Sequence, residues 1–247
     1  MIPIKSEEDL KMLQKSGKIL SKIIRRLQKF IRAGVSTIEI DRLAEKLIKE
    51  ENAISAFKGY NGFPANICTS VNEEVVHGIP AQKILKDGDI ISLDAGINYK
   101  GYISDVAITL PVGRIDPKSQ KLIEVTRNAL SEGIKQARVN NHLSDISYAI
   151  QTYVEKQGFS VVRQFVGHGI GYSLHEDPQI PNFGLPHQGE VLKKGMVFAI
   201  EPMVNMETWE CKIIDNGWTA VTKDGFPSAH FEHTVAITEN GPEILTN

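Results

Sequence analysis

The 247-residue sequence lacks the features that mark secreted, membrane and nucleic-acid-binding proteins. Its two cysteines, Cys68 and Cys211, are too few and too far apart for a disulfide scaffold, which indicates a reducing cytoplasm. No apolar run approaches the roughly 18 residues of a membrane span, and the charged start MIPIKSEEDL is not typical of a secretory signal. A formal net charge of −2 gives no electrostatic reason to expect a nucleic acid or an anionic membrane as partner.

Several catalytic and binding motifs are absent as well. The glycine-rich stretch FVGHGIGYSLHEDP at 165–178 does not fit a phosphate cradle, because Tyr172 stands where G-x-G-x-x-G requires glycine and Pro178 prevents a long helix directly after it. No Walker A, H-E-x-x-H or C-x-x-C sequence occurs, which excludes the P-loop, zincin and zinc-ribbon classes. Ser173 lies in GYSLH rather than in G-x-S-x-G, so a serine-hydrolase elbow is unsupported.

Capping residues and apolar spacing predict a pair of helices followed by strands. Ser6 to Asp9 has the composition of a helix cap, and Ser36-x-x-Glu39 is a capping box; apolar residues at helical spacing follow both. From about 54 to 112 the sequence is rich in β-branched residues with glycine and proline between them, which predicts strands.

The same order returns in the second part of the sequence. Asp116-Pro117 predicts the start of a third helix, since proline is favoured in the first helical turn, and Ser144 is expected to cap a fourth. A composition typical of strands then runs from 159 to 247 and predicts a second set of strands.

Two stretches of similar sequence support a duplicated unit. LKDGDIISLDAGIN at 85–98 matches LKKGMVFAIEPMVN at 192–205, which places Asp94 on Glu201. We therefore predict one domain spanning 1–247, with related halves at about 1–113 and 114–247. A site between such halves would draw its ligands from both.

Two carboxylates fall inside the apolar segment DIISLDAGINYKGYISDVAITL at 89–110. If this segment is a hairpin in which Asn98 pairs with Gly101, Asp94 lies directly opposite Asp105 on one face. Two like charges that face each other destabilise a sheet, and an unpaired buried carboxylate costs several kcal/mol.

Glu201 in MVFAIEPMV and Glu232 in SAHFEHTVAI also lie in apolar runs, and partner cations are missing from the nearby sequence. No lysine or arginine occurs in 89–99, 101–113, 195–211 or 224–247. A distant arginine could serve one acid, and a shared proton could serve one pair. Divalent cations serve all four, and two ions about 3.5–4 Å apart, bridged by carboxylates, are the economical solution.

His168 lies between Gly167 and Gly169, where small neighbours let backbone and metal approach closely. Beside four unpaired acids, it is predicted to be a metal ligand, and carboxylate oxygens with one imidazole suit Mn, Co, Fe or Zn. His77 and His175 are candidates for polarising or proton-handling roles. No role is assigned to the remaining histidines, His142, His187, His230 and His233.

Asp94, Asp105, His168, Glu201 and Glu232, with the phrases NEEVVHGIP, GHGIG, FAIEPMV and FEHTVAI, closely resemble the type I methionine aminopeptidases along essentially the whole chain. The resemblance implies the α+β pita-bread fold, in which pseudo-twofold duplicated halves share a curved antiparallel sheet covered by helices. It also implies a hydrolase that removes the initiator methionine from nascent proteins and peptides when the second residue is small.

The same resemblance implies the metal ligands. Asp94 would hold one ion, Asp105 and Glu232 would bridge two, and His168 and Glu201 would hold the other. Two divalent ions are implied, with cobalt, manganese, iron, zinc or nickel as candidates. Water or hydroxide activated by the two ions would attack the peptide.

The catalytic and binding residues follow from the same match. Glu201 would also shuttle a proton, His77 would contact the peptide near the scissile bond, and His175 would hydrogen-bond the amide carbonyl. The methionine side chain would bind among aromatic faces, which suit a thioether. The pocket would be lined by Tyr60, Phe63, Cys68, His77 and Trp218.

Four positions depart from the family pattern. Tyr172 replaces a common arginine, Leu174 a common phenylalanine, Phe57 a small residue or cysteine, and Asn61 a common histidine. These changes leave the predicted metal ligands intact and bear on the shape of the pocket.

Two other interpretations share the fold. A prolidase or aminopeptidase P relative would carry a further N-terminal domain, for which this chain has no length. A non-catalytic binding module would have lost ligands, and all five are present with His77 and His175. The 31 positions from Glu201 to Glu232 leave no room for the helical insertion of type II enzymes, and no zinc-finger extension is expected.

The expected setting is a cytoplasmic monomer that acts on nascent polypeptide N-termini at the ribosome, with no nucleic-acid or membrane partner. Because Ile2 is too large for the family's preference for small second residues, Met1 is predicted to be retained.

Overall fold

The computed structural model describes residues 2–247, and the predicted retention of Met1 lies outside the described residues. The helices are α1 (Glu7–Gln28), α2 (Thr37–Glu50), α3 (Pro117–Gln136) and α4 (Leu143–Lys156), and a short 3-10 turn, η1, spans Tyr60–Gly62. The strands before α3 are β1 (Ile54–Ser55), β2 (Cys68–Val71), β3 (Glu74–Val76), β4 (Ile90–Tyr99) and β5 (Tyr102–Pro111). The strands after α4 are β6 (Ser160–Val161), β7 (Gly167–Gly169), β8 (Glu176–Ile180), β9 (Val197–Ile200), β10 (Met203–Asn205), β11 (Cys211–Ile213), β12 (Ala220–Thr222), β13 (Ser228–His230), β14 (Glu232–Thr238) and β15 (Gly241–Ile244).

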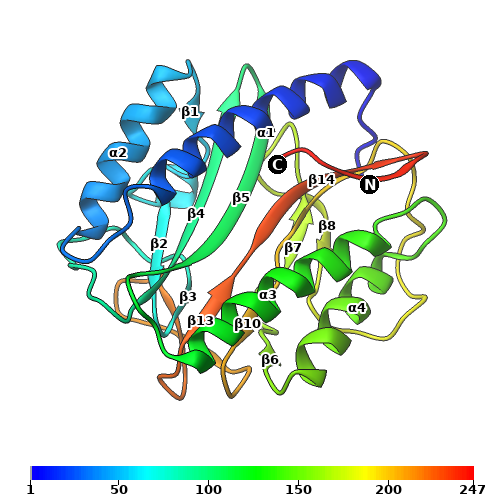
Figure 1. The fold of residues 1–247 in the computed structure, drawn as a ribbon. Coiled ribbons are helices and arrows are strands. Elements are labelled where there is room, and N and C mark those ends of the chain that lie inside the picture. Colours follow the sequence, from blue (N-terminus) through cyan, green and yellow to red (C-terminus); the bar gives the residue numbers. More distant parts are fainter. Residues whose placement is uncertain (1) are drawn as a thin grey trace.

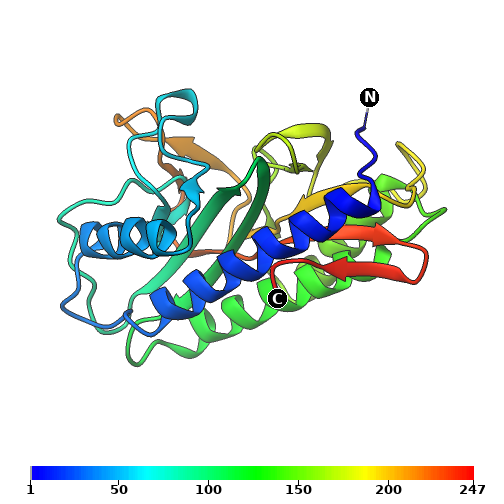
Figure 2. The same ribbon diagram turned by 90° about the horizontal axis from the view of Figure 1, so that it is seen from above.

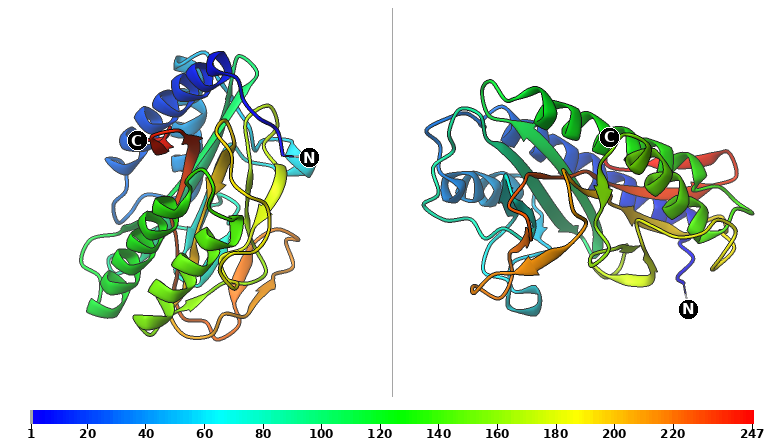
Figure 3. Two further views of the ribbon diagram at one scale, coloured as in Figure 1. Left: turned by 90° about the vertical axis from the view of Figure 1, so that its right-hand side faces the viewer. Right: turned by 90° about the horizontal axis from the view of Figure 1, so that it is seen from below.

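A nine-stranded antiparallel sheet forms the centre of the molecule (Figure 1). Its strand order is β1-β4-β5-β14-β9-β7-β8, with β15 beside β14 and β2 beside β4. Two smaller sheets have the orders β13-β10-β6 and β11-β12-β3. The four long helices lie on one face of the curved sheet, as an α+β protein is expected to arrange them (Figures 2 and 3). None of the described helices has both the length and the apolar character that crossing a membrane requires.

Three of the four helices begin where their caps predict. At α1, the Ser6 hydroxyl accepts a hydrogen bond from the Asp9 amide, and the Asp9 carboxylate accepts one from the Ser6 amide. At α2, the amide and the hydroxyl of Ser36 both donate hydrogen bonds to the Glu39 carboxylate. At α3, the Asp116 carboxylate accepts hydrogen bonds from two amides of the first turn, in which Pro117 lies.

The cap predicted for the fourth helix is wrong. Ser144 lies inside α4, and His142 is the capping residue. The His142 amide donates a 2.8 Å hydrogen bond to the Asp145 carboxylate, whereas the Ser144 hydroxyl accepts one from the Gln188 amide. An acidic side chain three residues after the cap satisfies the first free amide, so Asp145 was the stronger signal.

The β4–β5 hairpin differs from its predicted register by two residues. Lys100 and Gly101 form the turn, with φ of 55° and 88°, so Asp94 pairs with Ala107 and Gly96 pairs with Asp105. Glycine at the second turn position suits this left-handed two-residue turn, which the expected pairing did not allow for. Because side chains alternate along a strand, a shift by two keeps both aspartates on one face, as diagonal rather than direct neighbours.

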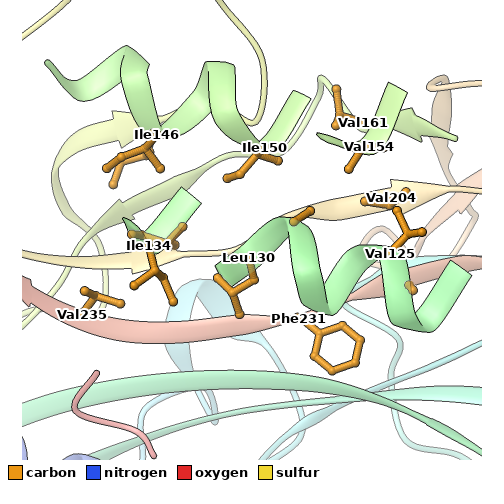
Figure 4. Close-up of a cluster of buried hydrophobic side chains, with 14 of the residues drawn as sticks. Val125, Leu130, Ile134, Ile146, Ile150, Val154, Val161, Val204, Phe231 and Val235 are labelled. Carbon is orange, nitrogen blue, oxygen red and sulfur yellow. The ribbon is translucent and has the colours of Figure 1, made fainter. Parts of the chain in front are cut away.

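Apolar side chains between the helices and the sheet form the core. On β4, Leu93 and Ala95 pack with Leu20 of α1 and Ile40 of α2. Figure 4 shows the corresponding cluster beneath α3 and α4. Asp94 lies between Leu93 and Ala95 in sequence, so it points to the face of the sheet that the helices leave uncovered.

Candidate metal centre and substrate pocket

Five adjacent strands of the large sheet bring the five predicted metal ligands together. Asp94 lies on β4, Asp105 on β5, Glu232 on β14 and His168 on β7, while Glu201 directly follows β9. Since β4-β5-β14-β9-β7 is also the spatial order of these strands, each contributes one side chain to a single cluster. Residues more than one hundred positions apart in the sequence become neighbours only through this pairing.

The cluster has the spacing of a metal site. Ligand atoms of Asp105, His168 and Glu232 lie within 4.8 Å of one another, and those of Glu201, Glu232 and His230 do the same. Within residues 2–247, no lysine or arginine forms an ion pair with any of the four carboxylates. Buried oxygens of Asp94 and Glu232 have no hydrogen-bond partner. Such orphaned oxygens are the condition that a divalent cation relieves.

Burial raises the pKa of all four carboxyl groups. For Asp94, Glu201 and Glu232 the negative charge of neighbouring carboxylates raises the pKa further, well above the ordinary value. Burial raises the pKa of Asp105 to about 7. Without cations the raised pKa values favour the protonated carboxyl groups, and divalent ions would take the place of those protons.

The tautomer of His168 also fits a cation. Burial, and then the neighbouring His175, lower the pKa of His168 to about 3, so its ring is neutral. Its Nδ1 lies 2.9 Å from the Gly169 carbonyl oxygen, which only accepts hydrogen bonds, so Nδ1 carries the proton. The lone pair of Nε2 therefore faces Glu201 Oε1 at 3.4 Å. A proton or a cation beside these two atoms would relieve the repulsion between their electron pairs.

The glycines around His168 permit close strand packing. A Cβ atom on Gly167 would lie 2.5 Å from the Ala199 carbonyl oxygen, and one on Gly169 would lie 2.1 Å from the Asp177 carbonyl oxygen. These contacts are with the neighbouring strands, so the glycines allow β7 to approach them and thereby place His168.

Two threonines position the backbone beside the ligands. Strands β5 and β14 pair directly at only two positions. On one side of these, the Thr234 hydroxyl accepts a 2.8 Å hydrogen bond from the Asp105 amide and donates another to the Asp105 carbonyl oxygen. On the other side, Thr109 makes the same two contacts with the backbone of His230. A hydroxyl between the strands spaces them apart where the carboxylates of Asp105 and Glu232 converge.

The cluster borders an apolar pocket that contains every residue of the predicted site. Aromatic rings form one wall: Phe63 packs edge-on against Trp218 at 5.2 Å between centroids, and against Phe57 at 6.5 Å. Cys68 pairs with Asp94 in the sheet and so joins the pocket to the acids. The lining comprises Phe57, Tyr60, Asn61, Phe63, Cys68, His77, Asp94, Asp105, His168, Leu174, His175, Glu201, Trp218 and Glu232.

Of the four unusual positions, three shape this pocket and one does not. Phe57, Asn61 and Leu174 line it. Tyr172 is instead half-exposed, with its ring 4.0 Å from the Nζ atom of Lys5. Tyr172 does not line the pocket, so the expected effect of this position on the shape of the pocket has no direct contact behind it.

The two other predicted histidines flank the cluster. His175 packs against His168 with 4.3 Å between ring centroids, and its Nδ1 lies 2.7 Å from the Tyr60 hydroxyl. His77 lies edge-on to both Phe165 and Trp218. Burial lowers the pKa of both, that of His77 to about 4, so both rings are neutral near pH 7. A neutral imidazole with one free N–H can donate a hydrogen bond to a carbonyl oxygen.

A second hollow opens on the other side of the cluster. It shares His77, Asp94, His168, His175 and Glu201 with the apolar pocket, and its other lining residues include Gln164, Phe165, Gln179 and Met203. Asp94 and Glu201 therefore line both the apolar pocket and this more polar hollow.

Sequence reasoning missed one member of the cluster. His230 received no role, yet it is buried and its Nε2 lies 3.4 Å from Glu201 Oε2. The signal was present, because His230 stands two residues before Glu232 and the alternation of strands favours one face for both. By the same rule His233 points away, and its ring bonds to Thr246.

Carboxylates and an imidazole beside an apolar pocket define a metalloenzyme site on an α+β scaffold. The model of metallopeptidase family M24 matches residues 11–239. The chain is 53% identical over 246 residues to methionine aminopeptidase 1 of Bacillus subtilis, an alignment that covers 100% of this chain and 99% of the relative. The chain belongs to metallopeptidase family M24, whose members depend on divalent metal ions.

Solved structures confirm the predicted pita-bread fold. The methionine aminopeptidase from Thermotoga maritima matches with a TM-score of 0.98 and 47% identity, over 100% of both chains. A prolidase from Pyrococcus furiosus matches with a TM-score of 0.79 and 24% identity, over 99% of this chain and 65% of the prolidase. The prolidase likeness shows a shared fold alone.

Proposed function

We propose that this protein is a type I methionine aminopeptidase that removes the initiator methionine from nascent proteins and peptides with a small second residue. The observation that carries the proposal is the aromatic pocket directly beside the carboxylate cluster. A methionine side chain in this pocket would place the first peptide bond next to the acids. The names of the full-length relatives support the same activity.

The proposed centre binds two divalent ions. Asp94 would hold one ion, Asp105 and Glu232 would be shared by the two, and His168 and Glu201 would hold the other. The unpaired buried oxygens and the lone pair of His168 support this assignment. When bound, the ions polarise the scissile carbonyl and lower the pKa of the attacking water. This donor set accepts cobalt, manganese, iron, zinc or nickel.

His175 is proposed to stabilise the carbonyl oxygen of the scissile bond. If the Tyr60 hydroxyl donates its hydrogen to Nδ1 across their 2.7 Å contact, the proton of the neutral ring is on Nε2. That N–H is then available to the substrate oxygen as negative charge develops there. His77, at the border of both hollows, is proposed to contact the peptide near the scissile bond.

Glu201 is proposed to move the proton. Burial and the charges of Asp94 and Asp105 raise the pKa of its carboxyl group, so it accepts a proton more readily than an ordinary glutamate. It would accept a proton from the attacking water and deliver it to the leaving amine.

The methionine pocket is proposed to bind the thioether through aromatic faces. Tyr60, Phe63 and Trp218 supply rings, while Cys68 and His77 complete the walls beside the acids.

A single catalytic domain with halves at about 1–113 and 114–247 is proposed for the chain. Helix α2 and helix α4 begin 106 residues apart, at Thr37 and Leu143. Each half also has an isolated bridge from its helix cap to a later loop, Ser36 to Ile84 and His142 to Val191. We propose that the protein works as a cytoplasmic monomer on chains emerging from the ribosome.

Reconstitution of the metal-free protein tests the proposal. Purified protein would receive Mn²⁺, Co²⁺, Fe²⁺ or Zn²⁺ in turn and then Met-Gly-Met-Met, Met-Ile-Met-Met or Pro-Gly-Gly. Release of methionine from the first peptide alone supports the proposal. The proposal would be overturned if Pro-Gly-Gly were cleaved as well as Met-Gly-Met-Met, or if the metal-loaded protein cleaved none of the peptides.

A further inference from the structure

His230 is a buried histidine that the proposed mechanism leaves without a part. It is the last residue of β13 and is 2% exposed. Its Nε2 atom has no hydrogen-bond partner. A neutral imidazole carries at least one group that seeks a partner, so an orphaned ring nitrogen in a closed interior calls for an explanation.

The orphaned atom is directed at a proposed metal ligand. His230 Nε2 lies 3.4 Å from Glu201 Oε2, and His168 Nε2 lies 3.4 Å from Glu201 Oε1. The Glu201 carboxylate therefore lies between two imidazoles, one for each oxygen. A small rotation of either side chain brings the His230 contact into hydrogen-bond range.

The His230 backbone is fixed from two sides, so the ring is not free to move elsewhere. Its amide donates a 2.8 Å hydrogen bond to the Thr109 hydroxyl, which in turn donates one of 2.9 Å to the His230 carbonyl oxygen. On the other edge, His230 pairs with Met203 of β10. The strands therefore fix the backbone of His230, and burial encloses its ring beside Glu201.

The two imidazoles around Glu201 have different parts. His168 donates its Nδ1 hydrogen to a carbonyl, which leaves a lone pair on Nε2 for a metal ion. We propose that His230 is a positioning residue: its Nε2–H donates to Glu201 Oε2 and turns Oε1 toward His168. This inference rests on the proposed ligand set, and it adds a residue that acts through Glu201 rather than on the ions.

The expected consequence is a loss of metal affinity when the donor is removed. Partners that orient a metal ligand are typically worth about 10–100-fold in affinity. Without His230, the Glu201 carboxylate can rotate and pays ordering entropy when it binds. Glutamine places an N–H group at nearly the same distance from the backbone as histidine Nε2, so it preserves the donor.

Calorimetric titration of metal-free protein with Mn²⁺ alone tests the inference. His230→Leu is expected to bind the Glu201 ion about tenfold or more weakly, whereas His230→Gln stays within about threefold of the unsubstituted protein. The matched control is His233→Gln, the same exchange on the adjoining strand, where the ring bonds to Thr246 and faces away. Its affinity is expected to be unchanged.

Each of the other outcomes overturns a defined part of the inference. The positioning role is refuted if His230→Leu binds Mn²⁺ with unaltered affinity. It is also refuted if His230→Gln and the His233→Gln control lose Mn²⁺ affinity equally. Because His230→Leu could fail to fold, electron spin-echo spectra of the unsubstituted protein with Mn²⁺ provide a separate test. One directly bound imidazole nitrogen supports the inference, and two would make His230 a ligand instead. If the unsubstituted protein binds no Mn²⁺, the metal centre itself is refuted.

Discussion

The contact between Tyr60 and His175 links one wall of the pocket to the proposed carbonyl-binding group. The Tyr60 hydroxyl lies 2.7 Å from His175 Nδ1 and is the group that orients the ring. Tyr60 contributes nothing to the carboxylate cluster, so its hydroxyl and the metal ions act separately.

Tyr60→Phe is therefore predicted to lower kcat by about tenfold, the cost of roughly one hydrogen bond. Mn²⁺ affinity should stay within about twofold of the unsubstituted value, since the ligands are untouched. Steady-state kinetics with Met-Gly-Met-Met and a parallel Mn²⁺ titration check this. A lost Mn²⁺ affinity with unchanged kcat would contradict the assigned role of the hydroxyl.

The catalytic role proposed for Glu201 is expected to carry a cost to stability. Its buried carboxyl group has a raised pKa because burial and two nearby aspartates disfavour its charge. A neutral amide of the same shape avoids that cost but cannot carry a proton or bind a cation as strongly.

Glu201→Gln is predicted to reduce activity by at least about a hundredfold. In EDTA at pH 8 the same variant should melt at a higher temperature than the unsubstituted protein, because burial raises the pKa of the Glu201 carboxyl group and so disfavours the ionisation that the unfolded chain undergoes. Thermal unfolding in EDTA and in Mn²⁺ measures both effects. A lower melting temperature in EDTA would show that Glu201 stabilises the metal-free protein.

The segment before α1 holds the loop that carries His175. Lys5 forms a 2.6 Å ion pair with Glu176, and the side chains are 0% and 9% exposed. Glu176 also accepts hydrogen bonds from the amides of Tyr172 and Ser173, so it organises the whole loop. The Lys5 amide donates to the Gly195 carbonyl oxygen, which anchors the segment to the turn before β9.

Lys5→Met is predicted to lower the free energy of unfolding by about 3–5 kcal/mol, the usual cost of leaving one partner of a buried ion pair uncompensated. The control is Lys194→Met, which removes an exposed pair with Glu7 and should change stability by less than about 1 kcal/mol. Urea unfolding at constant metal concentration compares the two. Equal effects would show that burial of the Lys5 pair has no energetic weight.

At the level of elements, local chemistry made most of the fold predictable. Caps at Ser6, Ser36 and Asp116 marked helix starts because they satisfy free amides, a local requirement. The errors arose where two local signals competed: Asp145 outweighed Ser144, and Gly101 moved the hairpin turn by one position. The order of strands in the sheet is a long-range property and was accessible only through the family resemblance.

At the scale of the whole molecule, the stability of the protein is predicted to depend on both pH and bound ions. The pKa values of Asp94, Glu201 and Glu232 are raised by burial and then by each other's charge or that of Asp105. A raised carboxyl pKa means that the folded state holds protons that the unfolded chain releases. That stability is present at low pH and is lost as pH rises toward the folded pKa.

Metal-free protein is accordingly predicted to lose stability as pH rises through about 7, the folded pKa of Asp105. Buried histidines with lowered pKa values make the folded protein more stable as pH rises. This gain is complete near pH 7, because the pKa of histidine in the unfolded chain is about 6.5. Saturating Mn²⁺ should abolish the decline, since the ions replace the protons. Melting temperatures across this range, with EDTA or with Mn²⁺, give the result. A metal-free protein that gains stability over the same range would contradict the pKa assignments.

The site was predictable because four acids in apolar runs had no cation near them in sequence. That argument is one of charge balance, and it needs no knowledge of strand order. His230 escaped it because a neutral histidine creates no such imbalance, and its meaning depends on its 3.4 Å contact with Glu201 across two strands. The positions of Phe57 and Leu174 in the pocket likewise emerge only from the packed structure.

The central claim is that Asp94, Asp105, His168, Glu201 and Glu232 hold two divalent ions beside the aromatic pocket. Anomalous diffraction from crystals grown with Mn²⁺, collected on both sides of the manganese absorption edge, tests it most directly. The account predicts two anomalous peaks roughly 3.5–4 Å apart, with the Asp105 and Glu232 carboxylates between them. An empty cluster in crystals that bind Mn²⁺ elsewhere would contradict it.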